Sequence, residues 1–549
     1  MTVATVRPMV MAACSENTAT TRTKWCDNFS IDTNYYDTGP ETGVTREYYL
    51  NLEQTTASPD GFNRPVYAFN GTIPGPTIVA DWGDIVKVHV TNSLTAARNG
   101  TSIHFHGIRQ NYTNQMDGVT SITECPVPPG GSTTYTWKAT QYGTSWYHSH
   151  IGLQAWEGAA GSIVINGPST QNYDYDGGPI LLSDWSHRPV DELYSAALTG
   201  GPPQMTNGLI NGSNIWANDS TTLGKRFSMS VKSGASYRLR LINGAIDTHF
   251  KFSIDSHTMT VIAMDFVPIK PYNTKVLDIA IGQRYDVVVT ADQALLASDF
   301  WIRAIPQTAC SNCANVDGIR GILYYDGVPS TPSSKPYAYT DACVDEPAES
   351  LVPHLPLQVG AQDGSDTEVL GLARSNVLQW TVDSISFNAS WSNPTLLQMQ
   401  NNETDFTTQS HVIQLDDANR WEYIVIQSSI PVSHPIHLHG HDFYVLAQGT
   451  GGYNSSYLTT SANPPRRDVA LLPAAGYLVL AFKTDNPGAW LMHCHIGWHT
   501  NMGLALQFVE QYKVAKQLVD VGRLTSTCDA WERYITAEKM IQYEYDDGI

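Results

Sequence analysis

A stretch near the C-terminus, His493-Cys494-His495-Ile496-Gly497-Trp498-His499, combines one thiol with three imidazoles. On a β-strand successive side chains point to opposite faces, so Cys494 should face away from His493 and His495. A thiolate with imidazoles is the ligand set of a blue-copper centre, whereas imidazoles alone suit copper, zinc or iron. An electron on a metal at Cys494 would cross one residue's backbone to reach metals at the flanking histidines. Taken alone, the stretch fits either a zinc site or two connected copper sites.

Paired histidines occur in three further segments, and they help to decide between zinc and copper. The segments are His104-Phe105-His106-Gly107, His148-Ser149-His150, and the run from His434 to His441 that contains His437-Leu438-His439. The chain has 17 histidines among 549 residues, so four His-x-His pairs far exceed what chance would give. The pattern therefore favours several copper ions.

The segments are related by an internal repeat, in which the region around His148-Ser149-His150 runs parallel to that around His493-Cys494-His495. The early copy lacks three potential ligands, because it has Thr101, Ser149 and Gln154 where the late copy has His434, Cys494 and His499. We therefore expect eight histidines from both copies to meet in one shared cluster. A single mononuclear thiolate site should survive in the late copy.

At this point the chain resembles the multicopper oxidases, and among them the laccases of ascomycete fungi. The resemblance covers almost the whole chain and includes the motifs Asn70-Gly71-Thr72, Pro74-Gly75-Pro76-Thr77, Ala80-Asp81-Trp82-Gly83-Asp84, Thr123-Glu124-Cys125-Pro126, Gly143-Thr144-Ser145-Trp146-Tyr147 and Arg466-Arg467-Asp468-Val469. It implies four copper ions: a type 1 copper on His434, Cys494 and His499, a type 2 copper on His104 and His437, and two type 3 coppers on His106, His148, His150, His439, His493 and His495. His441 closes its motif but is not expected to bind metal.

The secondary-structure signal is mainly β. Val86, Val88 and Val90 alternate with polar residues, as do Tyr237, Leu239 and Leu241, which predicts half-buried strands. The resemblance implies three cupredoxin-like Greek-key β-sandwich domains in series. We place an N-terminal segment at 1–26 and the domains at 27–168, 169–345 and 346–549. After Gln511 the pattern turns helical, with Val514, Leu518, Val519 and Val521 among polar residues, followed by Ala530 to Ile541.

Composition agrees with a large globular protein. Hydrophobic residues make up 42% of the chain and charged residues only 15%, and the net charge of -20 argues against nucleic-acid binding. No apolar run is long enough to span a membrane. The stretch from Met1 to Ala13 is too short for a signal peptide and is interrupted by Arg7 and Pro8, so we expect a processed or re-engineered start.

Glycosylation signals predict a secreted, N-glycosylated protein, which we expect to be a monomer. Sequons begin at Asn28, Asn70, Asn99, Asn111, Asn211, Asn218, Asn388, Asn402 and Asn454. The chain has eight cysteines, and with Cys494 reserved for metal an odd number remains. The resemblance implies disulfides Cys14–Cys26, Cys125–Cys528 and Cys310–Cys343, with Cys313 unpaired, although Cys310 and Cys313 could exchange roles.

Three further residues carry functional predictions. Leu504 follows His499 at the position of the family's axial residue, where it cannot coordinate copper, although it could simply fill the core. Without a coordinating side chain at this position, the type 1 copper should have a high reduction potential. Such a potential suits phenol oxidation and counts against bilirubin oxidases and ascorbate oxidases.

Asp117 matches a family acid that helps protonate reduced oxygen, although Asp-Gly is also an ordinary turn. Asp247 matches an acid of the phenol pocket. As a pocket acid with a pKa near roughly 4, it should be ionised in mildly acidic surroundings and accept the phenol's proton. Alone it would be interpreted as a solvated loop residue.

The C-terminus ends Asp546-Asp547-Gly548-Ile549. Ascomycete laccases end in a similar plug with Ser in place of Asp547, which enters the channel to the copper cluster. The alternative is a frayed acidic terminus.

The prediction is a laccase that oxidises small phenols one electron at a time and reduces dioxygen to water. One rival is a metallo-oxidase acting on Fe(II) or Mn(II), which would need a carboxylate cluster near His434 or His499; another is a multicopper oxidase such as bilirubin oxidase. A copper protein that only transfers electrons would leave the further paired histidines unexplained.

Overall fold

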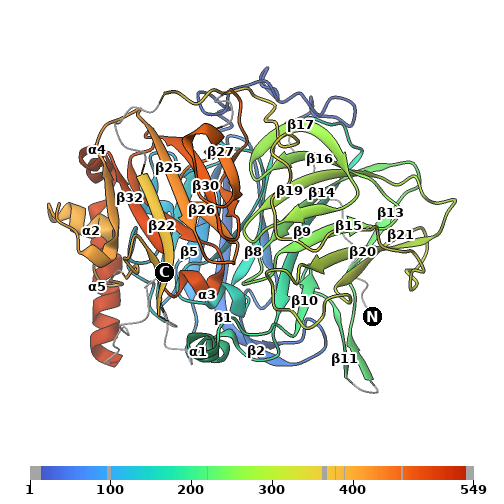
Figure 1. Cartoon of the computed structure of the whole chain (residues 1–549), viewed down its shortest axis with the longest axis horizontal. Coiled ribbons are helices and arrows are strands. Elements are labelled where there is room, and N and C mark those ends of the chain that lie inside the picture. Colours follow the sequence, from blue (N-terminus) through green and yellow to red (C-terminus); the bar gives the residue numbers. More distant parts are fainter. Residues whose placement is uncertain are drawn as a thin grey trace.

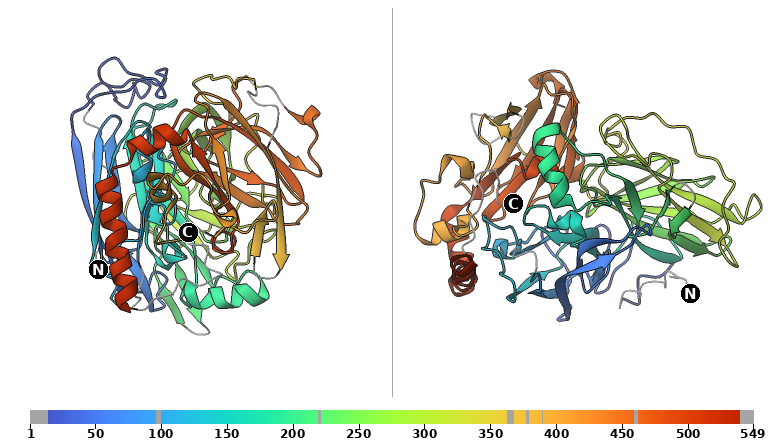
Figure 2. Two further views of the ribbon diagram at one scale, coloured as in Figure 1. Left: turned by 90° about the vertical axis from the view of Figure 1, so that its left-hand side faces the viewer. Right: turned by 90° about the horizontal axis from the view of Figure 1, so that it is seen from below.

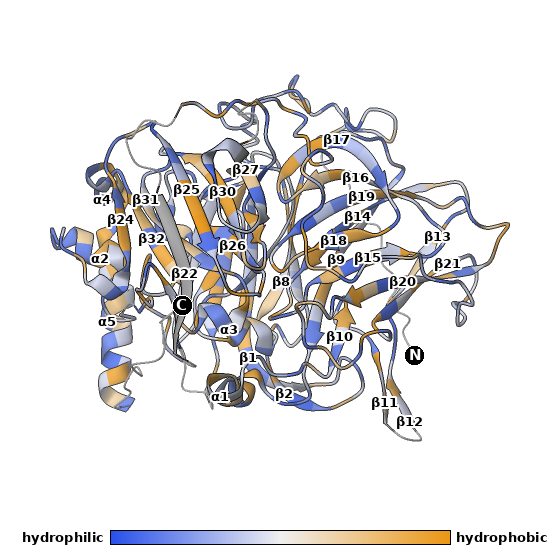
Figure 3. Ribbon diagram, viewed as in Figure 1, coloured by the Kyte–Doolittle hydropathy of each residue, from blue (hydrophilic) through white to orange (hydrophobic). Residues whose placement is uncertain are grey.

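The computed structural model describes residues 14–95, 100–218, 221–361, 368–376, 379–388, 390–458 and 462–538. Three β-sandwiches follow one another along the chain. In Figure 1 the first lies behind in blue, the second at the right in green, and the third at the left in orange and red. Figure 3 shows apolar residues concentrated on their strands. The predicted all-β architecture of three successive sandwiches is confirmed.

The first sandwich consists of two four-stranded sheets. Its strands are β1 (Thr45–Ala57), β2 (Arg64–Phe69), β3 (Gly75–Asp81), β4 (Ile85–Asn92), β5 (Ile103–Phe105), β6 (Ser132–Lys138), β7 (Gly143–Ser149) and β8 (Ala160–Asn166). The sheet orders are β2-β1-β4-β6 and β3-β8-β7-β5. The predicted strand with Val86, Val88 and Val90 is β4, and its three valines are buried while Lys87 and His89 are half-buried.

The second sandwich has a six-stranded and a five-stranded sheet. Its strands are β9 (Tyr175–Trp185), β10 (Asn207–Ile210), β13 (Ser228–Val231), β14 (Ser236–Asn243), β15 (Phe250–Ile254), β16 (Met259–Met264), β17 (Val267–Thr274), β18 (Leu277–Ile279), β19 (Arg284–Thr290), β20 (Asp299–Pro306) and β21 (Arg320–Tyr325), with a separate hairpin β11 (Ile215–Asn218) and β12 (Thr221–Gly224). The sheet orders are β10-β9-β14-β19-β16-β17 and β13-β21-β20-β15-β18.

The third sandwich has the same two sheet sizes. Its strands are β22 (Glu368–Asn376), β23 (Gln379–Val382), β24 (Val412–Leu415), β25 (Trp421–Ser428), β26 (His434–Leu438), β27 (Phe443–Thr450), β28 (Arg466–Arg467), β29 (Val469–Leu472), β30 (Gly476–Lys483), β31 (Gly488–Cys494) and β32 (Ala505–Glu510). The sheet orders are β23-β22-β25-β30-β27-β28 and β24-β32-β31-β26-β29. The orders β2-β1-β4-β6, β10-β9-β14-β19 and β23-β22-β25-β30 correspond, so the repeat extends to the middle domain.

Helices are few among the described residues and lie at the edges of the sandwiches. They are α1 (Val190–Gly200), α2 (Thr395–Gln400), α3 (Gly497–Thr500), α4 (Tyr512–Leu518) and α5 (Val521–Glu538), with 3₁₀ turns η1 (Asn114–Met116), η2 (Gln154–Glu157), η3 (Thr408–Ser410) and η4 (Ser455–Tyr457). The predicted helical tail corresponds to α4 and α5. Val519 lies between these helices in extended conformation, and Val514, Leu518 and Val521 are partly exposed.

One expectation about the middle domain is wrong. Tyr237, Leu239 and Leu241 lie in β14 as predicted, but the alternating Arg238 and Arg240 are buried rather than solvent-facing. Arg238 forms an ion pair with Asp286, and Arg240 forms one with Asp176. A buried arginine requires a paired carboxylate. The polar residues that alternate along β14 therefore form buried ion pairs and do not make up a solvated face of the strand.

Three disulfides have the pairing that the family resemblance implied: Cys14–Cys26, Cys125–Cys528 and Cys310–Cys343. Cys313 is the buried cysteine without a disulfide partner that was predicted. The Cys125–Cys528 bond fastens α5 to the first sandwich, and Figure 2 shows this helix in red beside the blue strands. Arg523 of α5 also lies 3.7 Å from Glu124.

The domain boundaries after residues 168 and 345 remain predictions, and both lie in connections between sandwiches. β8 ends at Asn166 and β9 begins at Tyr175, while residues 326–361 contain neither helix nor strand. None of the helices in the described part of the chain has the length and apolar character of a membrane span. The segment from Met1 to Ala13 and the expected plug Asp546 to Ile549 lie outside the described residues.

Candidate metal centres

Two equivalent strand pairs position the histidines. In the first sandwich β5 pairs with β7, which brings His104 opposite His148. In the third sandwich β26 pairs with β31, which brings His437 opposite His493. Paired residues on neighbouring antiparallel strands place their side chains on the same face of a sheet. Each repeat therefore presents two histidine pairs toward the other repeat.

Eight buried histidines meet where the two repeats face each other. The ring centroids of His106 and His437 lie 3.9 Å apart, and those of His104 and His439 lie 4.0 Å apart. Nε2 of His439 lies 3.3 Å from Nε2 of His493. Nitrogen atoms that lie within 4.8 Å of one another define the groups His104, His106 and His148; His104, His437 and His439; and His150, His439 and His493, while His495 lies 5.0 Å from His106 between ring centroids. The predicted joint cluster is thus assembled from both repeats.

The hydrogen bonds of these rings leave the opposite nitrogen available to a metal. Nδ1 donates to a backbone carbonyl in four rings: His104 to Asp117, His148 to Ser149, His437 to Asp468 and His493 to Cys494. A donor at Nδ1 fixes the tautomer with the lone pair on Nε2. Nε2 of His104, His148 and His437 is buried without a hydrogen-bond partner among the described residues, which fits a metal ligand.

Burial keeps these imidazoles neutral. Desolvation, reinforced by neighbouring histidines, lowers the pKa of His106, His437, His439 and His495 well below its ordinary value. Desolvation also lowers the pKa of His493 to about 4. Because a metal binds the neutral imidazole, the cluster requires no deprotonation cost near neutral pH.

The mononuclear site lies on the other side of β31. Sγ of Cys494 is 3.6 Å from Nδ1 of His434 and 3.6 Å from Nδ1 of His499. All three residues are buried, and burial lowers the pKa of His434 to about 3. His493 and His495 face the histidine cluster instead, as the strand alternation predicted. This set of one sulfur and two imidazole nitrogens suits a blue-copper ion.

A tryptophan that sequence reasoning missed covers this site. The ring of Trp380 lies 4.2 Å from that of His499 and 5.0 Å from that of His434. It belongs to β23 and comes from the opposite sheet of the sandwich, far away in sequence. The one signal available was a lone Trp in an apolar strand, which predicts only a core residue.

The early repeat contains a hydrogen-bonded substitute at the corresponding place. Ser149 donates to Oε1 of Gln154 at 2.8 Å, and Thr101 donates to the same oxygen at 3.1 Å. Three mutually bonded neutral side chains thus fill the volume that Cys494, His434 and His499 occupy in the late repeat. A site without a thiolate or imidazole offers poor ligands for copper.

Leu504 and His441, neither of which is expected to bind copper, both have specific contacts in the third sandwich. Leu504 is buried in the core, and its backbone carbonyl accepts a hydrogen bond from the Cys494 N–H. Nε2 of His441 lies 3.0 Å from Oε2 of Glu510, and its Nδ1 donates to the His439 carbonyl. His441 therefore lies against Glu510 and the His439 carbonyl, consistent with its expected absence from the ligand set.

Two carboxylates contact the histidine cluster, and only Asp117 was predicted. Oδ2 of Asp117 accepts a hydrogen bond from Nδ1 of His439 at 2.9 Å. Asp468 is the second, with Oδ1 lying 3.3 Å from Nε2 of His106. Arg284 pairs with both Asp468 oxygens. The motif Arg466-Arg467-Asp468-Val469 was visible in the sequence, but the contact of Asp468 with the cluster was not.

Asp247 is buried, so the reading of this residue as a solvated loop residue is wrong. Its Oδ2 has no hydrogen-bond partner among the described residues. Burial and the negative charge of Asp184 raise the pKa of Asp247 well above its ordinary value, which corrects the expected value near 4. A carboxylate with a raised pKa is the stronger proton acceptor once it is ionised.

Comparisons with known proteins agree with this geometry. Sequence models of the multicopper oxidase family match residues 51–170, 176–327 and 388–514. The chain is 48% identical to laccase-2 of Botryotinia fuckeliana, over 99% of this chain and 95% of that protein. The chain belongs to the multicopper oxidase family. The resident cofactors of this multicopper oxidase are therefore four copper ions.

Solved structures give the same fold. The crystal structure of the laccase from Botrytis aclada has a TM-score of 0.92 and 46% identity, covering 98% of this chain and 100% of that one. A multicopper oxidase that functions in iron import has a TM-score of 0.79 and 25% identity, covering 89% of this chain and 95% of that one. The three sandwiches of this multicopper oxidase are thus cupredoxin-like.

Proposed function

We propose that this multicopper oxidase is a laccase, which oxidises small phenols and reduces dioxygen to water. The observation that carries the proposal is the similarity to fungal laccases over nearly the whole chain, together with a thiolate–imidazole set adjacent to an eight-histidine cluster. His434, Cys494 and His499 would hold the type 1 copper. His104 and His437 would hold the type 2 copper, and the type 3 pair would be bound by His106, His148, His150, His439, His493 and His495.

When bound, the four coppers supply one-electron oxidation of the phenol and four-electron reduction of dioxygen to two waters. Cys494 connects the two sites, because its neighbours His493 and His495 belong to the cluster on the opposite face. The path between the sites is therefore one residue's backbone. Asp117 supports the oxygen side, since its carboxylate contacts His439 and can hold a proton at Oδ1.

On the phenol side, Asp247 provides the polar group. Its backbone neighbour Ile246 accepts a hydrogen bond from Gly497, which precedes His499 in α3. The carboxylate of Asp247 can accept a hydrogen bond from the phenol's hydroxyl and then its proton as the electron leaves. This coupling avoids a phenol radical cation of high energy.

The rival activity is oxidation of Fe(II) or Mn(II). Such ions need several oxygen ligands, and the carboxylate of Asp184 beside Asp247 is already engaged by backbone N–H groups. Steady-state kinetics on a methoxyphenol and on Fe(II), with copper content measured on the same sample, tests the assignment. We expect a far higher kcat/KM for the phenol. A preference for Fe(II) would contradict the proposal.

We further propose that the protein is a secreted, N-glycosylated monomer. The side chains of Asn28, Asn70, Asn111, Asn402 and Asn454 are exposed, which supports glycan attachment there. Asn211 differs, because this residue is half-buried and its amide accepts from the Leu181 N–H and donates to the Pro179 carbonyl. Glycopeptide mass spectrometry should therefore find Asn211 unmodified. Sedimentation velocity tests the monomer.

A further inference from the structure

The segment that carries Asp247 is a loop joining β14 to β15, residues 244–249, without helix or strand structure. A catalytic carboxylate on a loop requires other groups to fix its position, because small displacements sharply reduce rates. The loop is buried, and its backbone polar groups need partners. Where those partners come from determines what positions Asp247.

Asp184 is the partner of the central residues of this loop. It lies at the end of β9 and is 6% exposed. Its Oδ1 accepts from the Ile246 N–H at 2.9 Å, and its Oδ2 accepts from the Asp247 N–H at 3.0 Å. The hydroxyl of Thr248 donates to the same Oδ2 at 2.8 Å. One ionised carboxylate, which only accepts hydrogen bonds, thus binds three consecutive residues of the loop.

The opposite side of the loop contacts the segment between Cys494 and His499. The Gly497 N–H donates to the Ile246 carbonyl at 3.0 Å. This approach is close, because a Cβ on Gly497 would lie 2.7 Å from Cγ1 of Ile246 and 2.6 Å from Trp156. The loop is therefore held between Asp184 on one side and the type 1 ligand segment on the other.

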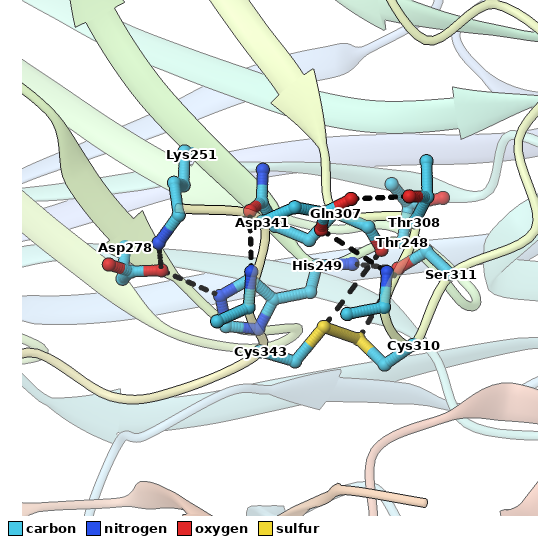
Figure 4. Close-up of a disulfide and its surroundings, with 12 residues drawn as sticks. Thr248, His249, Lys251, Asp278, Gln307, Thr308, Cys310, Ser311, Asp341 and Cys343 are labelled. Carbon is cyan, nitrogen blue, oxygen red and sulfur yellow. Dashed lines mark hydrogen bonds and ion pairs between the residues drawn. A yellow bond between two sulfur atoms is a disulfide. The ribbon is translucent and has the colours of Figure 1, made fainter. Parts of the chain in front are cut away.

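The end of the loop is fixed by the disulfide region of the same domain. The His249 N–H donates to Oγ of Ser311 at 2.9 Å, next to the Cys310–Cys343 bond, as Figure 4 shows. With its backbone anchored on both sides, Asp247 keeps one acceptor atom, Oδ2, without a partner among the described residues.

We propose that Asp184 is a positioning residue for phenol oxidation, which holds the Asp247 loop and so fixes the carboxylate of Asp247 for the substrate hydroxyl. This inference rests on the proposed role of Asp247 in the laccase reaction. Asp184 does not touch the phenol, because its two oxygens are engaged by the loop.

The primary test is Asp184→Asn, which keeps the shape of the side chain but replaces one acceptor oxygen with an NH₂ donor. That NH₂ would face a loop donor, so the loop must shift. We expect kcat/KM for a methoxyphenol to fall about 10- to 100-fold. The blue absorption and kcat/KM for a non-phenolic one-electron donor should remain unchanged. Loss of both activities together would indicate general damage and overturn the proposal.

Two further variants calibrate this effect. Thr248→Val removes one of the three donors at constant shape and should lower phenol kcat/KM by a smaller factor in the same direction. Asp174→Asn is the matched control, because Asp174 also accepts from a backbone N–H and a hydroxyl, both of Ser236, at an exposed position. It should leave all kinetics unchanged. Hydrogen exchange of peptide 244–249 should rise in Asp184→Asn but not in Asp174→Asn.

A double-mutant cycle separates this inference from the proposed function. If Asp184 acts through Asp247, Asp184→Asn combined with Asp247→Asn should match Asp247→Asn alone. If Asp247→Asn leaves phenol kinetics unchanged, the proposed role of Asp247 fails. If Asp247→Asn is impaired while Asp184→Asn behaves as the wild type, or if the two losses add, the Asp184 proposal is overturned and the laccase assignment stands.

Discussion

The backbone carbonyl of Asp117 accepts from Nδ1 of His104 at 2.9 Å, and that of Asp468 accepts from Nδ1 of His437 at 2.7 Å. The two aspartates therefore occupy equivalent places in the two repeats. Their carboxylates have different surroundings: Arg284 pairs with Asp468, whereas Oδ1 of Asp117 has no hydrogen-bond partner among the described residues. Of the two equivalent carboxylates, one is thus paired with an arginine, and the other contacts His439 and lies 3.2 Å from Nδ1 of His104.

Asp117→Asn should impair the oxygen side of the reaction. The amide keeps the contact with His439 but cannot donate a proton as an acid does. Loss of a general acid typically costs on the order of 10² or more in rate. We expect kcat to fall equally for phenolic and non-phenolic donors, with the blue absorption intact. Steady-state kinetics on both donors checks this, and a loss confined to phenols would contradict it.

Asp468→Asn should act on stability. It leaves the buried Arg284 with Asp265 at 3.5 Å as its remaining carboxylate partner. Breaking a buried ion pair from one side costs about 3–5 kcal/mol, and the residual pair favours the low end. Denaturant unfolding should show this loss relative to Asp117→Asn. Equal stability of the two variants would refute the distinction.

Cys494→Ser should remove the intense blue absorption, which arises from thiolate-to-copper charge transfer, and should abolish phenol oxidation. The histidine cluster does not contain Cys494, so three of the four coppers should remain bound. An absorption spectrum and a copper assay on one sample check both points. A variant that stays blue would show that electrons enter elsewhere.

Leu504→Met should lower the type 1 reduction potential, because a thioether donor stabilises Cu(II). Leu504 is buried beside Cys494, so the longer sulfur-containing side chain replaces apolar packing at the copper. Poorly reducing phenols should lose more kcat/KM than easily oxidised ones. The measurement is a redox titration of the blue band, in which an unchanged or higher potential would rule out an axial position.

Glu124→Gln should change how stability depends on pH. Burial raises the pKa of Glu124 to about 7, with Arg523 and Tyr135 opposing the shift. The folded state therefore holds a proton that the unfolded chain releases, so the contribution of Glu124 to stability falls as pH rises from about 4.5 to 7. The variant should exceed the wild type by on the order of 2–3 kcal/mol above pH 7 and match it near pH 4. Unfolding transitions across this range test it; a constant difference would refute the ionisation argument.

The sequence predicted the metal centres well because their geometry is local. Alternation along one strand separates Cys494 from His493 and His495, and the spacing of the two repeats specifies which ligands each contributes. The disulfides and the three sandwiches followed from the family resemblance. Asp117 was recognised for the same reason.

The remaining features depend on contacts between distant residues. Arg238 and Arg240 look like the solvated side of a strand until Asp286 and Asp176 are brought beside them by folding. Asp184 stands before a tryptophan at a strand end, and no local pattern relates it to a loop some sixty residues later. The raised pKa of Asp247 depends on burial by several elements and on that same neighbour.

The bond between Cys125 and Cys528 makes the molecule a covalent ring that contains the linker at 326–361. A protease that cuts this linker would therefore produce two fragments that remain joined. The nicked protein would keep its full mass on a non-reducing gel and separate only after reduction. The coppers would be bound by ligands from both fragments. An enzyme cut in this linker by a protease would therefore keep its two metal-binding parts together.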